Sequence, residues 1–216
     1  MVNIKKIEKM AVLSFQNGLR LHNDSIVLYN NESYPSAFSL SILSLEEIGK
    51  YFLIEDFVFY STTDKRYSPE VEEEIIKSIY YHHPKQMKFA RQSSLSRLSM
   101  KIVEDMYDGK FEKLKQVSIY VGLPRINGRI DLNGRISSPH KISNIKVKKQ
   151  ITRVNDFIIC LSAGVVKGFY GVDIDKLEEI LNHDLINKYR NLWPDMSRSS
   201  AAIFNRFMRY PDFTIE

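Results

Sequence analysis

The sequence has only one cysteine and no long hydrophobic run. Cys160 lies in the apolar segment 157–161, where a small buried hydrophobic side chain is expected, and a lone thiol excludes an internal disulfide. The longest apolar stretch, residues 157–166, is too short to span a bilayer. The first 30 residues contain no uninterrupted apolar core, so no signal peptide is expected. We therefore predict a cytoplasmic protein without a membrane segment.

Low-complexity segments are also missing. Hydrophobic residues make up 44% of the 216 residues, and 12 Phe and 12 Tyr are spread along the chain, which indicates a packed globule rather than a disordered tail. This length suits one domain with a well-buried core. Residues 1–216 are therefore predicted to form a single domain.

Positive charge is concentrated in one part of the chain. Residues 109–153 contain 11 Lys or Arg and two acidic residues, a net charge of +9, whereas the whole chain has +5 and the remainder therefore has −4. Such a segment can attract phosphate backbones or an acidic partner. The alternative is an ordinary solvated surface.

Apolar residues recur at helical spacing along most of the chain, and turn residues separate these segments. The second segment is apolar nearly all round, as expected for the central helix of a bundle. Helices are predicted over residues 4–29, 35–60, 69–83, 84–107, 138–166, 174–192 and 198–209. The predicted fold class is an all-α antiparallel helical bundle.

Residues 116–138 do not fit this helical pattern. The segment 117–121 has a strand-like composition. Two short repeats, residues 126–130 and 132–136, each contain an Asn-Gly pair typical of turns. A basic irregular or hairpin insertion is therefore predicted here.

Polar residues interrupt the apolar face of the second predicted helix. Glu47 and Lys50 share this face with apolar residues, and a buried carboxylate there would need a partner such as Lys50. Glu46 is predicted to be exposed. Gly49 is predicted to let a neighbouring helix approach closely.

The first predicted helix offers a matching polar stripe. Asn17, Arg20 and Asp24 are spaced by three and four residues and therefore share a face. Antiparallel pairing of the first two helices about residue 32 places Asn17 beside Glu47. The two stripes are predicted either to form one buried polar network or to make ordinary surface ion pairs.

Several short motifs occur in a characteristic order, of which the Leu-Glu-Glu-Ile-Gly-Lys segment at 45–50 is the most specific. These motifs are residues 17–21, 24–25, 34–37, 45–50, 82–86, 119–121 and 138–139. In order and spacing they resemble the AbiV group of bacterial phage-defence proteins, over roughly residues 10–165.

The resemblance implies a fold class and an activity. AbiV-like proteins are placed in the HEPN superfamily, helical bundles that often dimerise and many of which cleave RNA without a metal ion. The resemblance thus implies a HEPN-like bundle, a homodimer and a role in abortive infection, in which the infected cell halts its own growth. The usual HEPN signature is an Arg followed by four to six residues and a His, which act on the phosphate and in proton transfer.

Two sets of residues are candidates for catalysis. Arg135 and His140 have the spacing of the HEPN signature, but an Asn-Gly turn and Pro139 argue against a continuous helix there. The second set offers a base, an acid and phosphate-binding cations. Its members are His82, Lys85, Glu47, Lys50, Arg20 and Asp24.

In this second set, His82 is the predicted general acid or base, and Lys85 or Arg20 would neutralise the scissile phosphate. Solvated polar residues at helix ends are the alternative. Without clustered Cys or His ligands, no metal and no cofactor are predicted. RNA contacts are predicted at Arg125, Arg129, Arg135, Lys146, Lys148 and Lys149.

Two functions from different classes remain open, beside a helical nucleic-acid-binding regulator, against which the sequence has no recognition-helix pattern with clustered basic residues. The first is an abortive-infection effector that arrests translation by acting on RNA, as a metal-independent HEPN-type ribonuclease triggered by a phage protein. The second is a noncatalytic helical binding protein that captures a phage protein or a ribosomal component. The departure from the Arg and His signature favours the second function.

Overall fold

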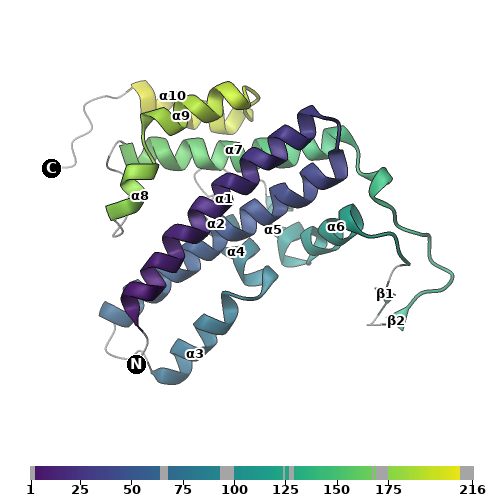
Figure 1. The fold of residues 1–216 in the computed structure, drawn as a ribbon, viewed down its shortest axis with the longest axis horizontal. Helices are drawn as coiled ribbons and strands as arrows, with labels where there is room; N and C mark the ends of the chain where they lie inside the picture. The colour runs from purple at the N-terminus through teal and green to yellow at the C-terminus, as the bar shows by residue number, and fades with distance from the viewer. Residues whose placement is uncertain are drawn as a thin grey trace.

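Two long antiparallel helices, α1 (Ile4–Asn30) and α2 (Tyr34–Thr63), lie side by side in the computed structural model (Figure 1). Gly18 allows their close approach, because a Cβ atom at this position would lie 2.8 Å from Cγ1 of Ile48. The hydroxyl of Ser44 donates a 2.7 Å hydrogen bond to the carbonyl oxygen of Gly18. The first helical hairpin is therefore tightly packed.

The structure describes residues 3–63, 68–92, 100–123, 125–126, 129–166, 168 and 175–209. The further elements are α3 (Pro69–Ser78), α4 (His82–Gln92), α5 (Met100–Tyr107), α6 (Lys110–Ile119), β1 (Arg125–Ile126), β2 (Arg129–Ile130), a 3-10 turn (Pro139–Lys141), α7 (Asn144–Val166), α8 (Asp175–Ile180), α9 (His183–Leu192) and α10 (Arg198–Arg209). This arrangement confirms the predicted all-α helical bundle.

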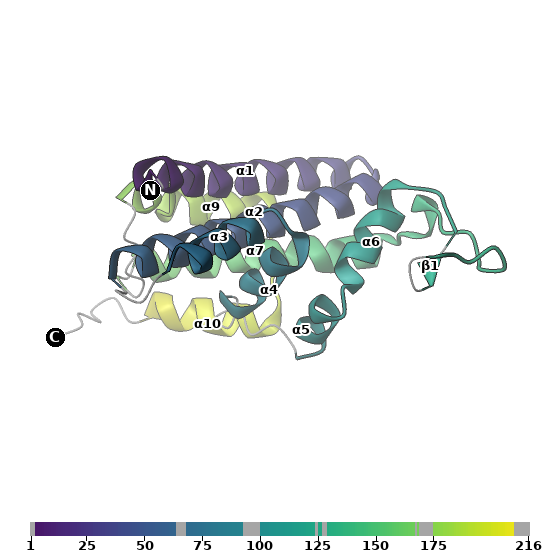
Figure 2. The same ribbon diagram turned by 90° about the horizontal axis from the view of Figure 1, so that it is seen from below.

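Helix α2 is the central helix of the bundle. It contacts α1, α4, α6 and α7, which explains why its sequence is apolar nearly all round. Helix α7 also packs against α9 and α10, while the β1–β2 hairpin projects from one end of the molecule (Figures 1 and 2). Among the described helices, none has the length and hydrophobicity needed to cross a membrane.

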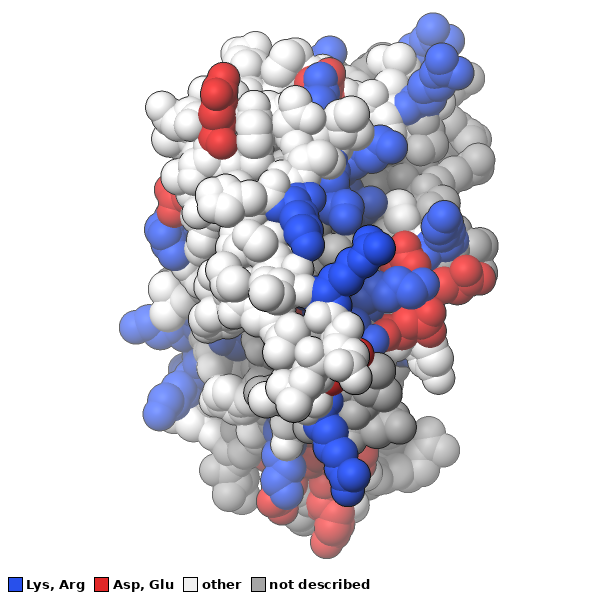
Figure 3. Space-filling model, turned by 90° about the vertical axis from the view of Figure 1, so that its right-hand side faces the viewer, with Lys and Arg blue, Asp and Glu red and all other residues white. Residues whose placement is uncertain are grey.

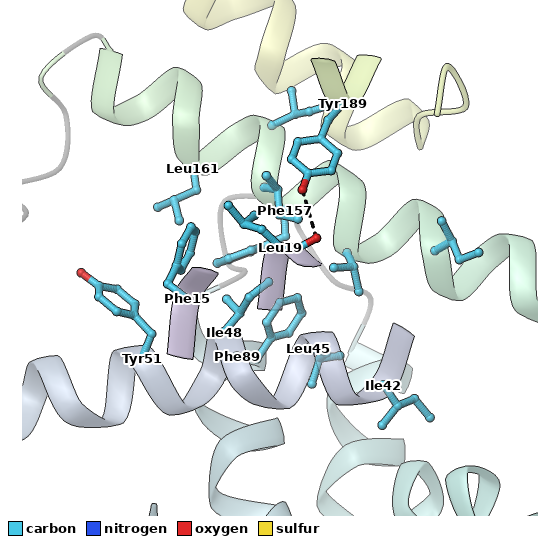
Figure 4. Close-up of a cluster of buried hydrophobic side chains, with 14 of the residues drawn as sticks. Phe15, Leu19, Ile42, Leu45, Ile48, Tyr51, Phe89, Phe157, Leu161 and Tyr189 are labelled. Carbon is cyan, nitrogen blue, oxygen red and sulfur yellow. Dashed lines mark hydrogen bonds between the residues drawn. The ribbon is translucent and has the colours of Figure 1, made fainter. Parts of the chain in front are cut away.

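Aromatic and aliphatic side chains from α1, α2, α4, α7 and α9 fill the core (Figure 4). Phe89 of α4 and Phe157 of α7 contact each other, with 4.5 Å between their ring centroids. Tyr189 of α9 joins this cluster, and its hydroxyl donates a 3.2 Å hydrogen bond to the carbonyl oxygen of Leu19. The core thus connects helices that are far apart in the sequence.

A buried polar network ties the C-terminal helices to α1. Nε2 of His22 lies 3.0 Å from Oδ1 of Asn155, whose amide group donates to the carbonyl oxygens of Tyr189 and Trp193. Burial lowers the pKa of His22 to about 4, although the hydrogen bond to Asn155 acts in the opposite direction. The imidazole of His22 is therefore neutral at physiological pH.

The middle of the chain differs in part from the sequence-based prediction. Residues 117–119 belong to α6 and not to a strand, because Lys115 and Ser118 are buried on one helical face. The predicted hairpin that follows is confirmed by the antiparallel pairing of Arg125 with Ile130. Residues 127–128, the first Asn-Gly pair, lie outside the described residues.

Several helix boundaries were also predicted wrongly, and the predicted helix 174–192 is divided into α8 and α9. Pro84 lies in the first turn of α4 and does not separate two helices, because proline is tolerated where backbone amides have no intrahelical partner. Helix α7 begins at Asn144, after the 3-10 turn, and not at residue 138. The predicted helix 84–107 corresponds to α4 and α5, with residues 93–99 outside the described residues.

Candidate functional site

The candidate site lies where α4 and α6 pack against α2. Gly49 of α2 allows the backbone of α4 to come close, because a Cβ atom there would lie 2.0 Å from the carbonyl oxygen of Lys85. This contact confirms the predicted role of Gly49. It also brings the first two turns of α4, which contain His82 and Gln86, next to Glu46 of α2.

Glu46 is buried, with 1% of its surface exposed, so its predicted exposure was wrong. Its Oε2 atom lies 2.8 Å from Nδ1 of His82, and its Oε1 atom accepts a 2.8 Å hydrogen bond from the amide of Gln86. Lys115 of α6 donates to the same carboxylate, 2.9 Å from Oε1. Four polar side chains from three helices therefore form one hydrogen-bonded cluster, although Oε1 of Gln86 is buried and has no hydrogen-bond partner among the described residues.

The ammonium group of Lys115 lies at the centre of this cluster. Besides Glu46, it lies 3.0 Å from Nδ1 of His82 and 2.7 Å from Oε2 of Glu112. Burial alone would raise the pKa of the Glu112 carboxyl, but Lys115, His82 and Gln116 together more than offset this effect and the pKa lies below its usual range. The amide of Gln116 holds the other oxygen of Glu112 at 3.0 Å.

His82 connects this buried cluster to solvent. Its side chain is 48% exposed, whereas that of Glu46 is 2% exposed. Nδ1 has two competing neighbours: it can donate to Glu46 or accept from Lys115, but not both at once. Nε2 makes no hydrogen bond to any residue that the structure describes. The ring therefore has one anchored nitrogen and one that can exchange protons with a ligand.

Lys85 lies between this cluster and a second polar cluster. It is 8% exposed, and burial lowers the pKa of its amine, although Glu46 and Glu47 act in the opposite direction. The charges of Lys50 and Lys115 lower the pKa of Lys85 further. Electrostatically, Lys85 is thus coupled to both clusters.

The second cluster contains the polar residues predicted for the first hairpin. The amide of Asn17 donates a 3.3 Å hydrogen bond to Glu47, as the antiparallel pairing predicted, and Lys50 lies 3.8 Å from the same carboxylate. Arg20 donates to Asn17 and forms a 2.8 Å ion pair with Asp24. Glu47 is half-buried, whereas Arg20 and Asp24 are exposed or nearly so, so this network lies at the surface of the hairpin.

Sequence reasoning missed four members of the buried cluster, namely Glu46, Gln86, Glu112 and Lys115. The Glu-x-x-Lys spacing of Glu112 and Lys115 is an ordinary helical ion pair and gave no signal of a site. Glu46 shares its helix with Glu47 but points toward α4 and α6 instead of α1. Only the docking of those helices distinguishes the two carboxylates.

The weaker candidate pair, Arg135 and His140, lies elsewhere. Both residues are exposed, Arg135 in an irregular segment and His140 in the 3-10 turn. In the described part of the chain, neither side chain makes an ion pair or a hydrogen bond. The structure therefore offers no partner that would orient His140.

The predicted RNA contacts lie near the same end of the molecule. Lysine and arginine side chains are spread over this end, with acidic side chains in smaller groups beside them (Figure 3). Arg129, Lys146 and Lys149 are exposed, whereas Lys148 forms a 2.8 Å ion pair with Asp195. The side chain of Arg125 lies outside the described residues.

The cluster around Glu46 has the elements of acid–base chemistry. A buried carboxylate orients an imidazole, and the amines of Lys85 and Lys115 lie beside it. The same carboxylate, with His82 and Glu112, also has the ligand types of a metal site. Both kinds of chemistry use His82.

Comparisons with known proteins identify the family. Neither a curated protein nor a solved structure matches the chain significantly. The HEPN family model described as AbiV matches residues 6–159, which include α2, α4, α6 and most of α1 and α7, and therefore the whole cluster around Glu46. Because this match covers more than half of the sequence, the chain belongs to the AbiV family.

Proposed function

We propose that this protein is an abortive-infection effector that arrests growth of the infected bacterial cell by cutting RNA, with His82 as the residue that transfers the proton. Membership of the AbiV family supports the role in phage defence. The observation that carries the RNA-cutting step is the 2.8 Å contact between Nδ1 of His82 and the buried carboxylate of Glu46. This contact fixes the ring and leaves Nε2 toward solvent.

The proposed reaction is the attack of a ribose 2′-hydroxyl on the adjacent phosphate. Nε2 of His82 accepts the proton of the 2′-hydroxyl, the 2′-oxygen forms a bond to phosphorus, and the bond to the 5′-oxygen breaks. The 5′-oxygen takes up a proton from water and His82 later releases its own proton to water, so the products are a 2′,3′-cyclic phosphate and a 5′-hydroxyl. The positive charges of Lys85, Lys50 and Arg20 would stabilise the phosphate in the transition state.

The proposal extends to partners. We infer that the protein forms a homodimer, that the growth arrest results from a stop in translation, and that a phage-encoded protein triggers it. Family membership supports these inferences. The exposed basic residues Arg129, Lys146 and Lys149 support contact with RNA, because phosphate backbones bind such surfaces through their charge.

The test compares His82→Ala with His83→Ala. His83 is the exposed neighbour of His82 on α4, and its ring bonds the carbonyl oxygen of Tyr107 at 3.1 Å, so its replacement is a matched control. Cells that express each variant are infected with phage, and their ribosomal, messenger and transfer RNA is sequenced from the ends. New 2′,3′-cyclic phosphate ends should occur with the wild type and with His83→Ala, but not with His82→Ala.

A noncatalytic binding protein is the second candidate function. The ion pair between Lys115 and Glu46 favours it, because a buried pair between two helices can fix a bundle without any reaction. In this case His82→Ala would still arrest growth after infection, and no RNA ends would depend on His82. That outcome would sink the ribonuclease proposal and leave the phage-defence role intact.

A further inference from the structure

We infer that Glu46, His82 and Glu112 form a binding site for one divalent transition-metal ion, which Lys115 fills with its ammonium group when no metal is bound. We further infer that an ion at this site blocks the proposed RNA cleavage, since it takes Nδ1 of His82 and the carboxylate of Glu46. The binding site rests on geometry alone. The inhibition rests on the proposed function.

The donor set is the first argument. One ligand atom from each of Glu46, His82 and Glu112 lies within 4.8 Å of the other two. Ligands bound to one zinc ion at about 2.0–2.2 Å lie roughly 3–4 Å apart, so the site must contract slightly on binding. Two carboxylates and one imidazole are donors that zinc accepts in proteins, with a further position for water.

Lys115 is the second argument, because its ammonium group marks a position built for a cation. Nζ lies 2.9 Å from Oε1 of Glu46, 3.0 Å from Nδ1 of His82 and 2.7 Å from Oε2 of Glu112. The same three side chains are the proposed metal ligands. The side chain of Lys115 is 6% exposed, so this cation is held inside the protein.

Hydrogen bonds from neighbouring side chains also fix the orientation of the two carboxylates, as is usual for metal ligands. Gln86 donates to Oε1 of Glu46 at 2.8 Å, and Gln116 donates to Oε1 of Glu112 at 3.0 Å. Oε2 of Glu112 is buried, and apart from its ion pair with Lys115 it receives no hydrogen bond from a described residue. This oxygen can therefore take a metal ion without losing another partner.

Charge decides how a metal ion would compete with Lys115. The carboxylates of Glu46 and Glu112 together carry two negative charges, which a divalent ion offsets fully and the single ammonium of Lys115 only by half. Lys85 is a second buried cation near Glu46 and opposes metal binding. We therefore expect a site that is occupied only when the metal concentration rises, after the flexible side chain of Lys115 has moved out.

The imidazole determines which ion binds. Magnesium and calcium prefer oxygen ligands, whereas imidazole suits zinc, copper, iron and nickel. Zinc is the probe of choice for affinity because it has no redox chemistry of its own. Cobalt can serve as a coloured substitute for zinc.

The experiment measures zinc binding by the full chain with isothermal titration calorimetry, in parallel with the visible absorption of bound cobalt. The wild type should bind one zinc ion per chain, and Glu112→Gln should bind it at least tenfold more weakly. Glu104→Gln removes the same charge at an exposed position of α5 and should bind zinc like the wild type. A tenfold excess of magnesium should not displace the ion.

Lys115→Met removes the competing ammonium and should bind zinc at least tenfold more tightly than the wild type. If this variant does not fold, the zinc affinities of Glu112→Gln and Glu104→Gln alone decide whether the proposed site exists. Absence of saturable binding in the wild type, or equal affinity of Glu112→Gln and Glu104→Gln, would overturn the proposed site.

The inhibition is tested separately on RNA. Zinc should suppress cleavage by the wild type at concentrations that saturate the calorimetric site, and at least tenfold higher concentrations should be needed for Glu112→Gln. Cleavage that is unaffected at saturation would overturn the inhibition and leave the metal site standing. If the protein cuts no RNA at all, the proposed function fails, while the titrations still decide on the metal site.

Discussion

Gly49 of α2 lies directly beneath the carbonyl oxygen of Lys85, so closely that a Cβ atom on Gly49 would be 2.0 Å from that oxygen. Backbone atoms cannot yield to such a contact as the end of a flexible side chain can. The missing side chain of Gly49 therefore sets the distance between α2 and α4. This distance in turn sets the contacts of His82 and Gln86 with Glu46.

Replacement of Gly49 by Ala should push α4 away from α2. We expect the free energy of unfolding to fall by about 1–3 kcal/mol, the usual range for overpacking, and His82 to lose its contact with Glu46. Urea denaturation measures the stability. Gly122→Ala is the control, since a Cβ atom there meets nothing within 4 Å, and it should leave the stability almost unchanged.

Neighbouring carboxylates on α2 should differ in their importance for stability. Glu46→Gln removes the buried charge that pairs with Lys115, and we expect a loss of about 3 kcal/mol. Glu47→Gln acts on a half-buried group 3.8 Å from Lys50 and should cost less than about 1 kcal/mol. Equal losses for both variants in chemical denaturation would contradict the assignment of Glu46 as the buried carboxylate.

Stability should depend on the protonation of His22. Its pKa is about 4 in the folded protein and about 6.5 in the unfolded chain, so between these values the unfolded chain binds more protons. The stability from His22 is therefore complete above about pH 6.5 and is lost as the pH falls toward 4, by up to about 3 kcal/mol. Urea titrations at several pH values measure this effect. Between about pH 6.5 and 4, the His22→Gln variant should lose less stability than the wild type, because it lacks the titrating imidazole.

The basic surface should contribute to RNA affinity in proportion to its free charges. Lys146 and Lys149 are exposed, whereas Lys148 is already paired with Asp195 at 2.8 Å. If RNA binds here, Lys146→Ala and Lys149→Ala should each reduce the slope of log affinity against log salt by about 0.7, the value per phosphate contact of a single strand. Lys148→Ala should change it less. Filter binding at several salt concentrations provides the measurement.

Cys160 should be unreactive in the folded protein. Its side chain is fully buried in α7, and burial raises the pKa of the thiol to about 12, so almost no thiolate is present at neutral pH. A colourimetric thiol reagent should therefore label Cys160 only after denaturation. Rapid labelling under native conditions would show that α7 is not packed as described.

Local patterns made much of the fold predictable. The pairing of Asn17 with Glu47 followed from helical spacing on two consecutive helices joined by a short turn, because such a turn fixes which residues lie opposite each other. The β1–β2 hairpin followed from its Asn-Gly turn signal in the same way. These contacts depend on residues close in the chain.

The buried cluster was beyond the reach of such patterns. Glu46 and Glu47 are adjacent acidic residues of one helix, and neither periodicity nor composition shows which one α4 and α6 will cover. The partners of Glu46 lie 36 positions away at His82 and 69 positions away at Lys115. Sequence analysis therefore proposed His82 and Lys85 as candidate site residues but did not predict that the carboxylate of Glu46 contacts the ring.

The sequence by itself determined the helical bundle, its first hairpin, the concentration of basic residues and the resemblance to AbiV proteins, since amphipathic spacing and turn residues act locally. Tertiary structure alone decided which charges are buried, because burial depends on helices docked from distant segments. At Glu46 the deciding contact is the backbone of α4 resting on Gly49, which closes the interior around one carboxylate and leaves Glu47 at the surface of the hairpin.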